Sequence, residues 1–339
     1  MTDAATHHAI RPTGGRLRMT RGFAAIAAAT VLVFAVGAVV APSSISHSAI
    51  VGMMPFAAVL AIAGLGQLLV VQQGGIDLSV AGGISLAVVV VTHQPDGDSS
   101  RLGAAVAMAV GFAIAAGLVN GLLVSRLRLS AIIATLGVNA LLYGAVFAVS
   151  GGTPRSTTRL LAQLAGDTTW RVPNAAWFAA AAIAVVAVLT KRTVAGRRFE
   201  AVGANPAAAR AIGLRVGVHR TLAFVWAQLL YCLAGILLAG ITHQPTAFQG
   251  DALLLPSVAV VVLGGTSLLG GRGFPIATAI AAVFLRELQQ LVLALGVDTS
   301  VQILVQAVAL AAGVALYSVD WPSVRRWWLA HRHPGGTPS

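Results

Sequence analysis

Ten apolar runs, joined by short polar segments, take up most of the sequence. Hydrophobic residues make up 57% of the chain and charged residues only 9%. A helix of about 20 apolar residues matches the thickness of the hydrocarbon core and satisfies its own backbone hydrogen bonds there. The pattern therefore predicts an all-α polytopic membrane protein with about ten transmembrane helices. The predicted spans are Phe23–Ala41, Ile50–Val71, Leu78–Thr92, Leu102–Val124, Ile132–Val149, Ala175–Thr190, Thr221–Gly240, Phe248–Leu263, Phe274–Leu295 and Val301–Val319.

Two of these spans are short for a straight crossing. Leu78–Thr92 predicts a tilted or broken helix, and Phe248–Leu263 is interrupted by Pro256. The second run either crosses the membrane or only re-enters it. A re-entrant segment would place the arginines of the C-terminal tail outside, which favours the crossing.

The basic residues are distributed unevenly between the two predicted faces. Seventeen of the 22 Lys and Arg residues fall in segments on one face, which the positive-inside rule assigns to the cytoplasm together with both termini. We therefore expect a basic cytoplasmic tail at 1–21, a transmembrane domain at 22–320 with a cytoplasmic segment at 191–220, and a cytoplasmic tail at 321–339. The longest external loop is 150–173. The net charge of +12 is spread over these short clusters, so it does not indicate nucleic acid binding.

The longest polar interruption of the apolar pattern is GRRFEAVGANPAAARAIGL at 196–214. Asn205 can cap a helix, Pro206 suits the first helical position, and Gly213 can adopt the left-handed conformation that ends many helices. These residues predict a short helix over 206–212 outside the membrane, which is suited to contact a partner protein. A loop helix with no partner is the alternative. The small apolar face expected on this helix consists of Ala208, Ala209 and Ile212.

Motifs for catalysis are missing from the sequence. GGTSLLGGRG at 264–273 has the glycines of a phosphate-binding loop, but such a loop needs Lys and then Ser or Thr after its last glycine. Arg272 and Gly273 stand there instead, so we expect a tight turn that brings two helices close together. The chain has one cysteine and no His/Glu metal-ligand spacing. We therefore predict no catalytic residues, no metal site and no cofactor.

Several polar side chains lie inside or beside predicted spans. Charges within the membrane usually face a bundle interior or an aqueous cavity, so Arg286, Glu287 and Gln290 are candidates for the translocation pathway. Neighbouring residues diverge by about 100° on a helix, so Arg286 and Glu287 are not expected to pair. Asp77 is the fourth candidate. The alternatives are side chains that hold helices or subunits together and, for Asp77 and Ser79, capping of the third helix.

The segment GANPAAARAIGL at 203–214 resembles the cytoplasmic coupling segment of permease subunits in sugar-type ABC importers, the ribose, xylose and arabinose family. GGIDLSVAGG at 74–83 and VVVLGGTSLLGGRG at 260–273 resemble two more stretches of that family, in the same order. The similarity runs from about residue 50 to residue 318. The resemblance assigns the ATPase-coupling helix to Gly203, Asn205, Pro206, Ala208, Ala209 and Gly213.

This resemblance implies a set of partners in the bacterial cytoplasmic membrane. They are cytoplasmic ATP-binding subunits, an extracytoplasmic solute-binding protein and a second permease subunit, identical or not. The chain itself would have no ATPase site, and movement of the 206–212 helix would rock the spans between outward and inward access. The binding protein would dock near the 150–173 loop, which carries Arg155, Arg159 and Arg171.

The chain departs from the family pattern at two places that bear on the solute. LLLPSVAVV at 253–261 replaces an acidic-then-alanine run, and RELQQL at 286–291 replaces an Asn-Gly pair. A monosaccharide is the first expectation, with a branched-chain amino acid or a nucleoside as alternatives. An ion-coupled secondary transporter is the alternative of a different class. It would need an intramembrane carboxylate, and Glu287 is the only deep one.

Overall fold

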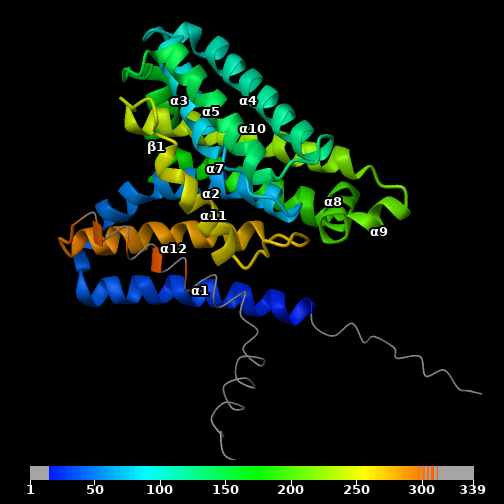
Figure 1. Cartoon of the computed structure of the whole chain (residues 1–339). Coiled ribbons are helices and arrows are strands. Elements are labelled where there is room, and N and C mark those ends of the chain that lie inside the picture. The colour runs from blue at the N-terminus through cyan, green and yellow to red at the C-terminus, as the bar shows by residue number, and fades with distance from the viewer. Residues whose placement is uncertain (1–14, 299, 302–303, 305–306, 309–310, 312–339) are drawn as a thin grey trace, which may run out of the picture.

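The computed structural model describes residues 15–298, 300–301, 304, 307–308 and 311, which are predominantly helical (Figure 1). The predicted all-α membrane fold is confirmed at this level. The longer helices are α1 (Gly15–Val40), α2 (His47–Gln72), α3 (Val80–His93), α4 (Leu102–Ser125), α5 (Ala131–Ser150), α6 (Arg159–Gly166), α7 (Asn174–Arg192), α8 (Val194–Ala204), α10 (Val216–Thr242), α11 (Leu254–Leu263) and α12 (Pro275–Ala294). The shorter elements are η1 (Pro42–Ile45), η2 (Ser99–Arg101), α9 (Pro206–Ala211), η3 (Asp251–Leu253) and the strands β1 (Thr168–Thr169) and β2 (Val172–Pro173).

Helix α2 forms the centre of the bundle, with α7, α10, α11 and α12 packed around it (Figure 1). In the most apolar 18-residue window of α2, 89% of the residues are buried. The corresponding share in the other long helices is 17–61%. Glycines permit the close approach. A Cβ atom at Gly64 would lie 2.5 Å from Val260 Cγ2, and one at Gly66 would lie 2.5 Å from the Tyr231 ring. Small residues are the usual means by which helices approach closely in membranes.

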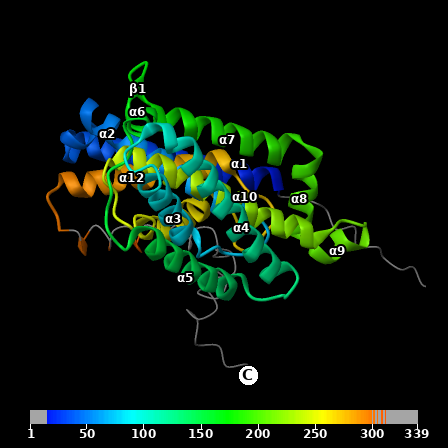
Figure 2. The same ribbon diagram turned by 90° about the horizontal axis from the view of Figure 1, so that it is seen from above.

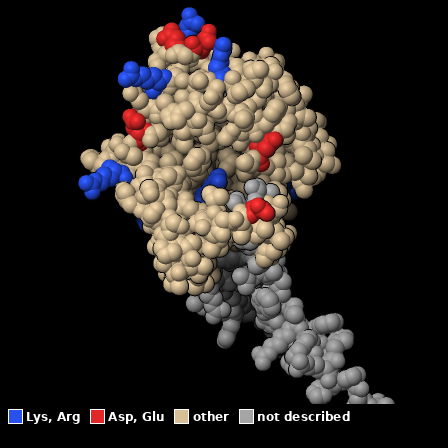
Figure 3. Space-filling view, turned by 90° about the vertical axis from the view of Figure 1, so that its left-hand side faces the viewer, with Lys and Arg blue, Asp and Glu red and all other residues tan. Residues whose placement is uncertain are grey.

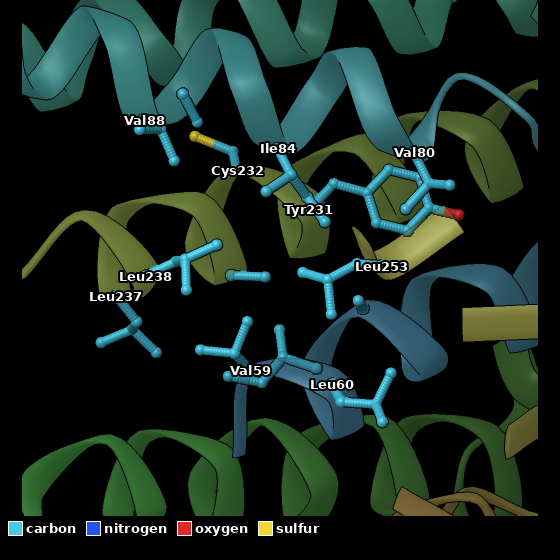
Figure 4. Close-up of a cluster of buried hydrophobic side chains, with 14 of the residues drawn as sticks. Val59, Leu60, Val80, Ile84, Val88, Tyr231, Cys232, Leu237, Leu238 and Leu253 are labelled. Atoms are coloured by element: carbon cyan, nitrogen blue, oxygen red, sulfur yellow. The ribbon is translucent and has the colours of Figure 1, made fainter. Parts of the chain in front are cut away.

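The short helix α3 is enclosed by protein. It is about 21 Å long at 1.5 Å per residue, less than the hydrocarbon core of about 30 Å. Ile84 and Val88 of α3 belong to a buried cluster with Val59 of α2 and Leu238 of α10 (Figure 4). Irregular backbone at membrane depth is tolerated only where protein or a water-filled cavity covers it. In the non-helical segment that precedes α3, Asp77 and Ser79 are fully buried, so protein covers this part of the segment.

Seven helices in the described part of the chain are long and apolar enough to cross a membrane, and α3 and α11 are shorter. Helices α1, α4, α5 and α7 are only 17–33% buried in their most apolar windows, and they expose side chains such as Val39 and Leu141. An apolar outer surface of this kind suits contact with lipid. The predicted tenth span, Val301–Val319, lies almost entirely outside the described residues, and the 321–339 tail lies wholly outside them.

Several predicted boundaries differ from the observed ones. Helix α1 begins at Gly15 rather than Phe23, inside the predicted tail, and α10 begins at Val216 rather than Thr221. Arginine is a good helix former, so a helix continues beyond the apolar run that crosses the membrane. The 150–173 loop is also more ordered than a plain loop, because it contains α6 and an antiparallel β1–β2 hairpin.

The segments predicted to be external meet at one end of the molecule. Arg155 Nη2 lies 3.1 Å from Asp96 Oδ1 in the α3–α4 loop, and the Thr157 N–H donates a hydrogen bond to the His243 carbonyl at 2.8 Å. This end faces the viewer in Figure 3, where charges of both signs lie side by side at the upper edge. Helices α8 and α9 lie at the opposite end (Figures 1 and 2).

Which end faces the cytoplasm stays a prediction, and cysteine labelling tests it. In a Cys232→Ala background, Leu160→Cys on α6 should react with an impermeant maleimide in intact cells, whereas Ala207→Cys on α9 should react only after the cells are opened. Both positions are exposed, so accessibility alone does not separate them. The reverse labelling pattern would invert the topology.

Candidate functional site

Helix α9 is a separate short helix between α8 and α10. The Asn205 Oδ1 atom accepts hydrogen bonds from the N–H groups of Ala207 (3.1 Å) and Ala208 (3.0 Å). Pro206 occupies the first helical position, where no backbone donor is needed. Gly213 has φ +82°, the left-handed conformation expected after the helix. The predicted cap, start and stop are confirmed, and the helix ends at Ala211 rather than at residue 212.

The predicted partner-facing surface of α9 needs correction at one residue. Ala209 is 2% exposed and packs against Val202 of α8 and Val216 of α10. Its placement on an exposed face with Ala208 and Ile212 is therefore wrong, because a helix lying on α8 and α10 turns one side inward. Ala208 is exposed, and Ile212 is 73% exposed. These two side chains remain available to a partner.

The three sequence stretches quoted above meet at one point, which we call the glycine junction: Gly74, Gly203, Gly270 and Gly271. The Gly271 N–H donates a hydrogen bond to the Gln72 carbonyl at 2.9 Å. A Cβ atom at Gly203 would overlap that same carbonyl oxygen. One at Gly270 would lie 2.8 Å from the Gly203 carbonyl oxygen and 3.1 Å from the Gly74 nitrogen. Backbone therefore packs directly on backbone here.

The glycine junction links α8 to the end of α2. The Gln73 side chain strengthens this link, because its Nε2 donates a hydrogen bond to the Phe199 carbonyl of α8 at 3.0 Å. The turn at 264–273 also brings α11 and α12 close together, since a Cβ atom at Gly264 would lie 2.8 Å from the Thr278 nitrogen. This was the expected role of the turn. The additional contact with α8 was not predicted.

A buried polar network lies around the non-helical segment that joins α2 to α3. The Ser79 Oγ donates a hydrogen bond to Asp77 Oδ1 (2.5 Å) and accepts hydrogen bonds from Asn120 Nδ2 (2.8 Å) and Gln228 Nε2 (2.7 Å). All four residues are at most 1% exposed. The network thus ties this segment to both α4 and α10. Asp77 Oδ1 also accepts from the Ser79 N–H (2.9 Å), which forms a local turn before α3. Ser79 is the N-cap residue of α3, but its side chain makes no hydrogen bond to the helix, so the capping interpretation is wrong.

Gln67 of α2 holds the same segment from the other side. The orientation of its amide that satisfies every neighbour donates to Tyr231 Oη (2.9 Å) and to the Asp77 carbonyl (3.0 Å), and accepts from the Asp77 N–H (3.1 Å). Sequence reasoning missed Gln67, Asn120 and Gln228. The available signal was an amide side chain inside an apolar run, where it needs a polar partner.

The charged residues of α12 lie beside α1. Gln290 Nε2 donates a hydrogen bond to the Ser44 carbonyl at 2.5 Å, and Glu287 is fully buried. The Glu287 Oε1 would lie 3.3 Å from a Cβ atom at Gly37 of α1. No ion pair joins Arg286 to Glu287 in the described part of the chain, as expected from their directions. The contacts of Glu287 and Gln290 support a packing role, and their place in a translocation pathway stays a prediction.

The arginines of the predicted docking loop are all exposed. Arg155 pairs with Asp96, Arg159 begins α6, and Arg171 has φ +64° in the β1–β2 turn. Their role in docking stays a prediction.

The sequence profile of the family described as "Branched-chain amino acid transport system / permease component" matches residues 49–314. The chain belongs to this family of ABC permeases. The permease is 34% identical to a probable ABC transporter permease of Sinorhizobium fredii, over 92% of this chain and 94% of that protein. It is 31% identical to the ribose import permease of Escherichia coli, over 84% and 90% of the two chains. It is 36% identical to an autoinducer 2 import permease of an Enterobacter species, over 68% and 67%. No solved structure matches it.

Family membership and apolar helices together define the kind of protein. The permease is a multi-pass protein of the bacterial cytoplasmic membrane and a component of an ABC importer. It works with ATP-binding subunits and a solute-binding protein. An ion-coupled secondary transporter is not supported.

The polar network of the permease makes a prediction about stability. Ser79→Ala removes the hydroxyl that serves Asp77, Asn120 and Gln228, so several buried polar groups lose a partner. We expect the free energy of unfolding to fall by about 2–5 kcal/mol, since each unsatisfied buried group costs about 1–3 kcal/mol. Thermal unfolding of the purified permease measures this. The exposed Ser43→Ala should leave the unfolding temperature unchanged, and equal curves for the two variants would rule out the network as a stabilising element.

Proposed function

We propose that this permease carries a monosaccharide into the cell, powered by ATP hydrolysis in separate subunits. The observation that carries this proposal is the 31% identity to a ribose import permease over 84% of the chain. The glycine junction supports it, because it places the three stretches of the sugar-importer pattern in mutual contact. The two departures from that pattern, at 253–261 and 286–291, bear on which sugar is carried.

The proposed mechanism begins at the exposed face of α9, where the ATP-binding subunits would push. Two packed contacts lead from α9 into the bundle. Ala209 packs on Val202 and Val216, which connects α9 to α8 and α10. Through the glycine junction α8 then connects to α2. Helices α2 and α10 meet again around the Ser79 network, so a displacement of α9 would act on both sides of the same segment. Coupling through packed elements of this kind can switch a bundle between two arrangements.

The same proposal gives positions to the second permease subunit and to the solute-binding protein. Two permease subunits would enclose the solute pathway between them. The solute-binding protein would dock on the end that carries α6 and the β1–β2 hairpin, near Arg155, Arg159 and Arg171. The orientation with α8 and α9 in the cytoplasm is part of this proposal, and the arginine asymmetry supports it.

An uptake assay on the reconstituted importer tests the solute class. The complex of permease, ATP-binding subunits and binding protein would be placed in vesicles with ATP on the nucleotide-accessible side. We expect ATP-dependent uptake from a panel of labelled sugars that includes ribose, xylose and arabinose. Leucine and uridine represent the two alternative solute classes. ATP-dependent uptake of either one, without uptake of any sugar, would contradict the proposal.

The proposed pathway role of Glu287 has its own test. Glu287→Gln preserves the shape of the side chain and removes the charge. Because neither oxygen of the buried carboxylate has a hydrogen-bond partner in the described part of the chain, assembly should be retained. An intramembrane carboxylate is by default a functional candidate, so we expect the uptake rate to change. Unchanged uptake with normal assembly would assign Glu287 to helix packing alone.

A further inference from the structure

A basic groove opens at the end of the molecule that carries α9. It has a volume of about 850 Å³ and lies between the end of α2, the α4–α5 turn, α9 with the residues after it, and the start of α10. Among the residues that the structure describes, no Asp or Glu lines it. The cationic side chains that line it are Arg128, Arg210, Arg215 and Arg220. Arg210 belongs to α9, so this helix borders the groove, although neither Ala208 nor Ile212 lines it.

The arginines of this groove lack counterions. In the part of the chain that the structure describes, none of the four forms a salt bridge. The Arg220 Nε atom is buried without a hydrogen-bond partner, and the charge of Arg210 acts unfavourably on Arg220. Helix α10 begins at the groove with no side-chain cap, which adds a partial positive charge. A concave site with charge of one sign concentrates ions of the other sign, and guanidinium groups match phosphate geometry.

Apolar residues line part of the groove, and others lie exposed on the helices that form it. Val124, Leu129 and Phe224 belong to its walls. Close by in the sequence, on the same helices, Leu122 of α4 and Leu222 of α10 are 47% and 45% exposed. Binding of a small soluble anion would not be favoured by such apolar surface. The combination of unpaired arginines with exposed apolar helices matches a molecule that has an anionic head and hydrocarbon chains.

We propose that this groove binds the phosphate headgroup of an anionic phospholipid, with its acyl chains along the exposed faces of α4, α5 and α10. Basic pockets between transmembrane helices on the cytoplasmic side are the usual form of such sites. Gln73, Gly74 and Gly75 also line the groove, so it lies beside the segment that carries Asp77, but lipid binding there does not depend on which solute is carried. Because α9 and α10 border the groove, a bound lipid would sit beside the elements that are proposed to move.

Native mass spectrometry of the full-length permease tests this proposal with phosphatidylglycerol and phosphatidylcholine of equal chain length. The variant Arg215→Gln/Arg220→Gln should bind one phosphatidylglycerol about thirtyfold more weakly than the unmodified permease, since each cation near an anionic lipid contributes about a factor of five. Binding of phosphatidylcholine should not change. The matched control is Arg197→Gln/Arg198→Gln, which removes two exposed charges from α8 outside the groove and should retain phosphatidylglycerol binding.

Other results would overturn the proposal. Equal phosphatidylglycerol binding in the groove variant and the unmodified permease would exclude the site. Equal losses in the groove variant and the α8 control would show only a general attraction to basic surface. Displacement of the lipid by millimolar glycerol phosphate would indicate a site for a soluble phosphate. Displacement by the ATP-binding subunit, with loss of subunit association in the groove variant, would assign the groove to an acidic protein surface.

Discussion

Replacing Gly203 by alanine should abolish ATP-dependent uptake while the permease still inserts in the membrane. The added Cβ atom would overlap the Gln72 carbonyl oxygen. That carbonyl also accepts the hydrogen bond of the Gly271 N–H, and Gly270 lies close to it. The overlapping atom belongs to the backbone, so the overlap cannot be relieved by the movement of a flexible side chain. Overpacking typically costs about 1–3 kcal/mol, and here it can be relieved only by shifting α8, and with it α9, away from α2.

A glycine in a different environment provides the control. A Cβ atom at Gly137 of α5 would have nothing within 4 Å, and alanine favours the helix by up to about 1 kcal/mol. Gly137→Ala should therefore transport normally and unfold at the same or a higher temperature. Uptake and thermal unfolding would be measured for both variants. Normal uptake by Gly203→Ala would show that the contact of α8 with α2 is not needed for coupling.

Ala208→Glu should prevent the ATP-binding subunits from driving the permease. Ala208 is exposed on α9 and Ile212 directly after it, and a small side chain there lets a partner approach closely. Glutamate adds bulk and a charge that the contact would strip of water without a partner, so docking should weaken by several kcal/mol. The substitution lies outside the bilayer and does not touch the bundle. We expect normal membrane levels, reduced subunit association and no solute-stimulated ATP hydrolysis.

Two comparisons make this result specific. Leu164→Glu introduces the same charge at an exposed position of α6, at the opposite end of the molecule, and should leave the association of the ATP-binding subunits unchanged. Ala209→Glu should behave differently from Ala208→Glu, because Ala209 is buried on Val202 and Val216. It should disrupt the packing of α9 on its own chain and lower the unfolding temperature. Equal unfolding temperatures of Ala208→Glu and Ala209→Glu would contradict the observed orientation of α9.

Local features of the structure could be predicted well from the sequence. Apolar runs locate the spans because lipid tolerates little else. Asn205, Pro206 and Gly213 locate α9 because capping and left-handed stops depend on neighbouring residues only. The direction of α9 could not be predicted. Four of its six residues are alanine, so the helix has no apolar periodicity that would distinguish the inward side at Ala209 from the outward side at Ala208.

The features that could not be predicted from the sequence are mainly contacts between segments that are far apart in the chain. Ser79 is 41 residues from Asn120 and 149 from Gln228, and each amide alone predicts only that some partner exists. The glycine junction is similar, because the glycines near 74, 203 and 270 predict turns, while their common need for space is visible only once they are brought together. Glu287 shows the same limit. Its depth suggested a pathway, and its neighbours on α1 and η1 lie some 240 residues away in the sequence.

Cross-linking from α9 tests the proposed coupling most directly. In a Cys232→Ala background, single cysteines at Ala208 and Ile212 would be labelled with a short cross-linker that has a maleimide at one end and a photoreactive group at the other, in membranes that contain the whole importer. The photoreactive end needs no thiol on the partner. We predict a cross-linked product of the permease with an ATP-binding subunit from both positions and none from Leu164→Cys on α6. If neither α9 position cross-links while the same importer shows solute-stimulated ATP hydrolysis, ATP-driven motion enters the permease elsewhere and the proposed role of α9 is wrong.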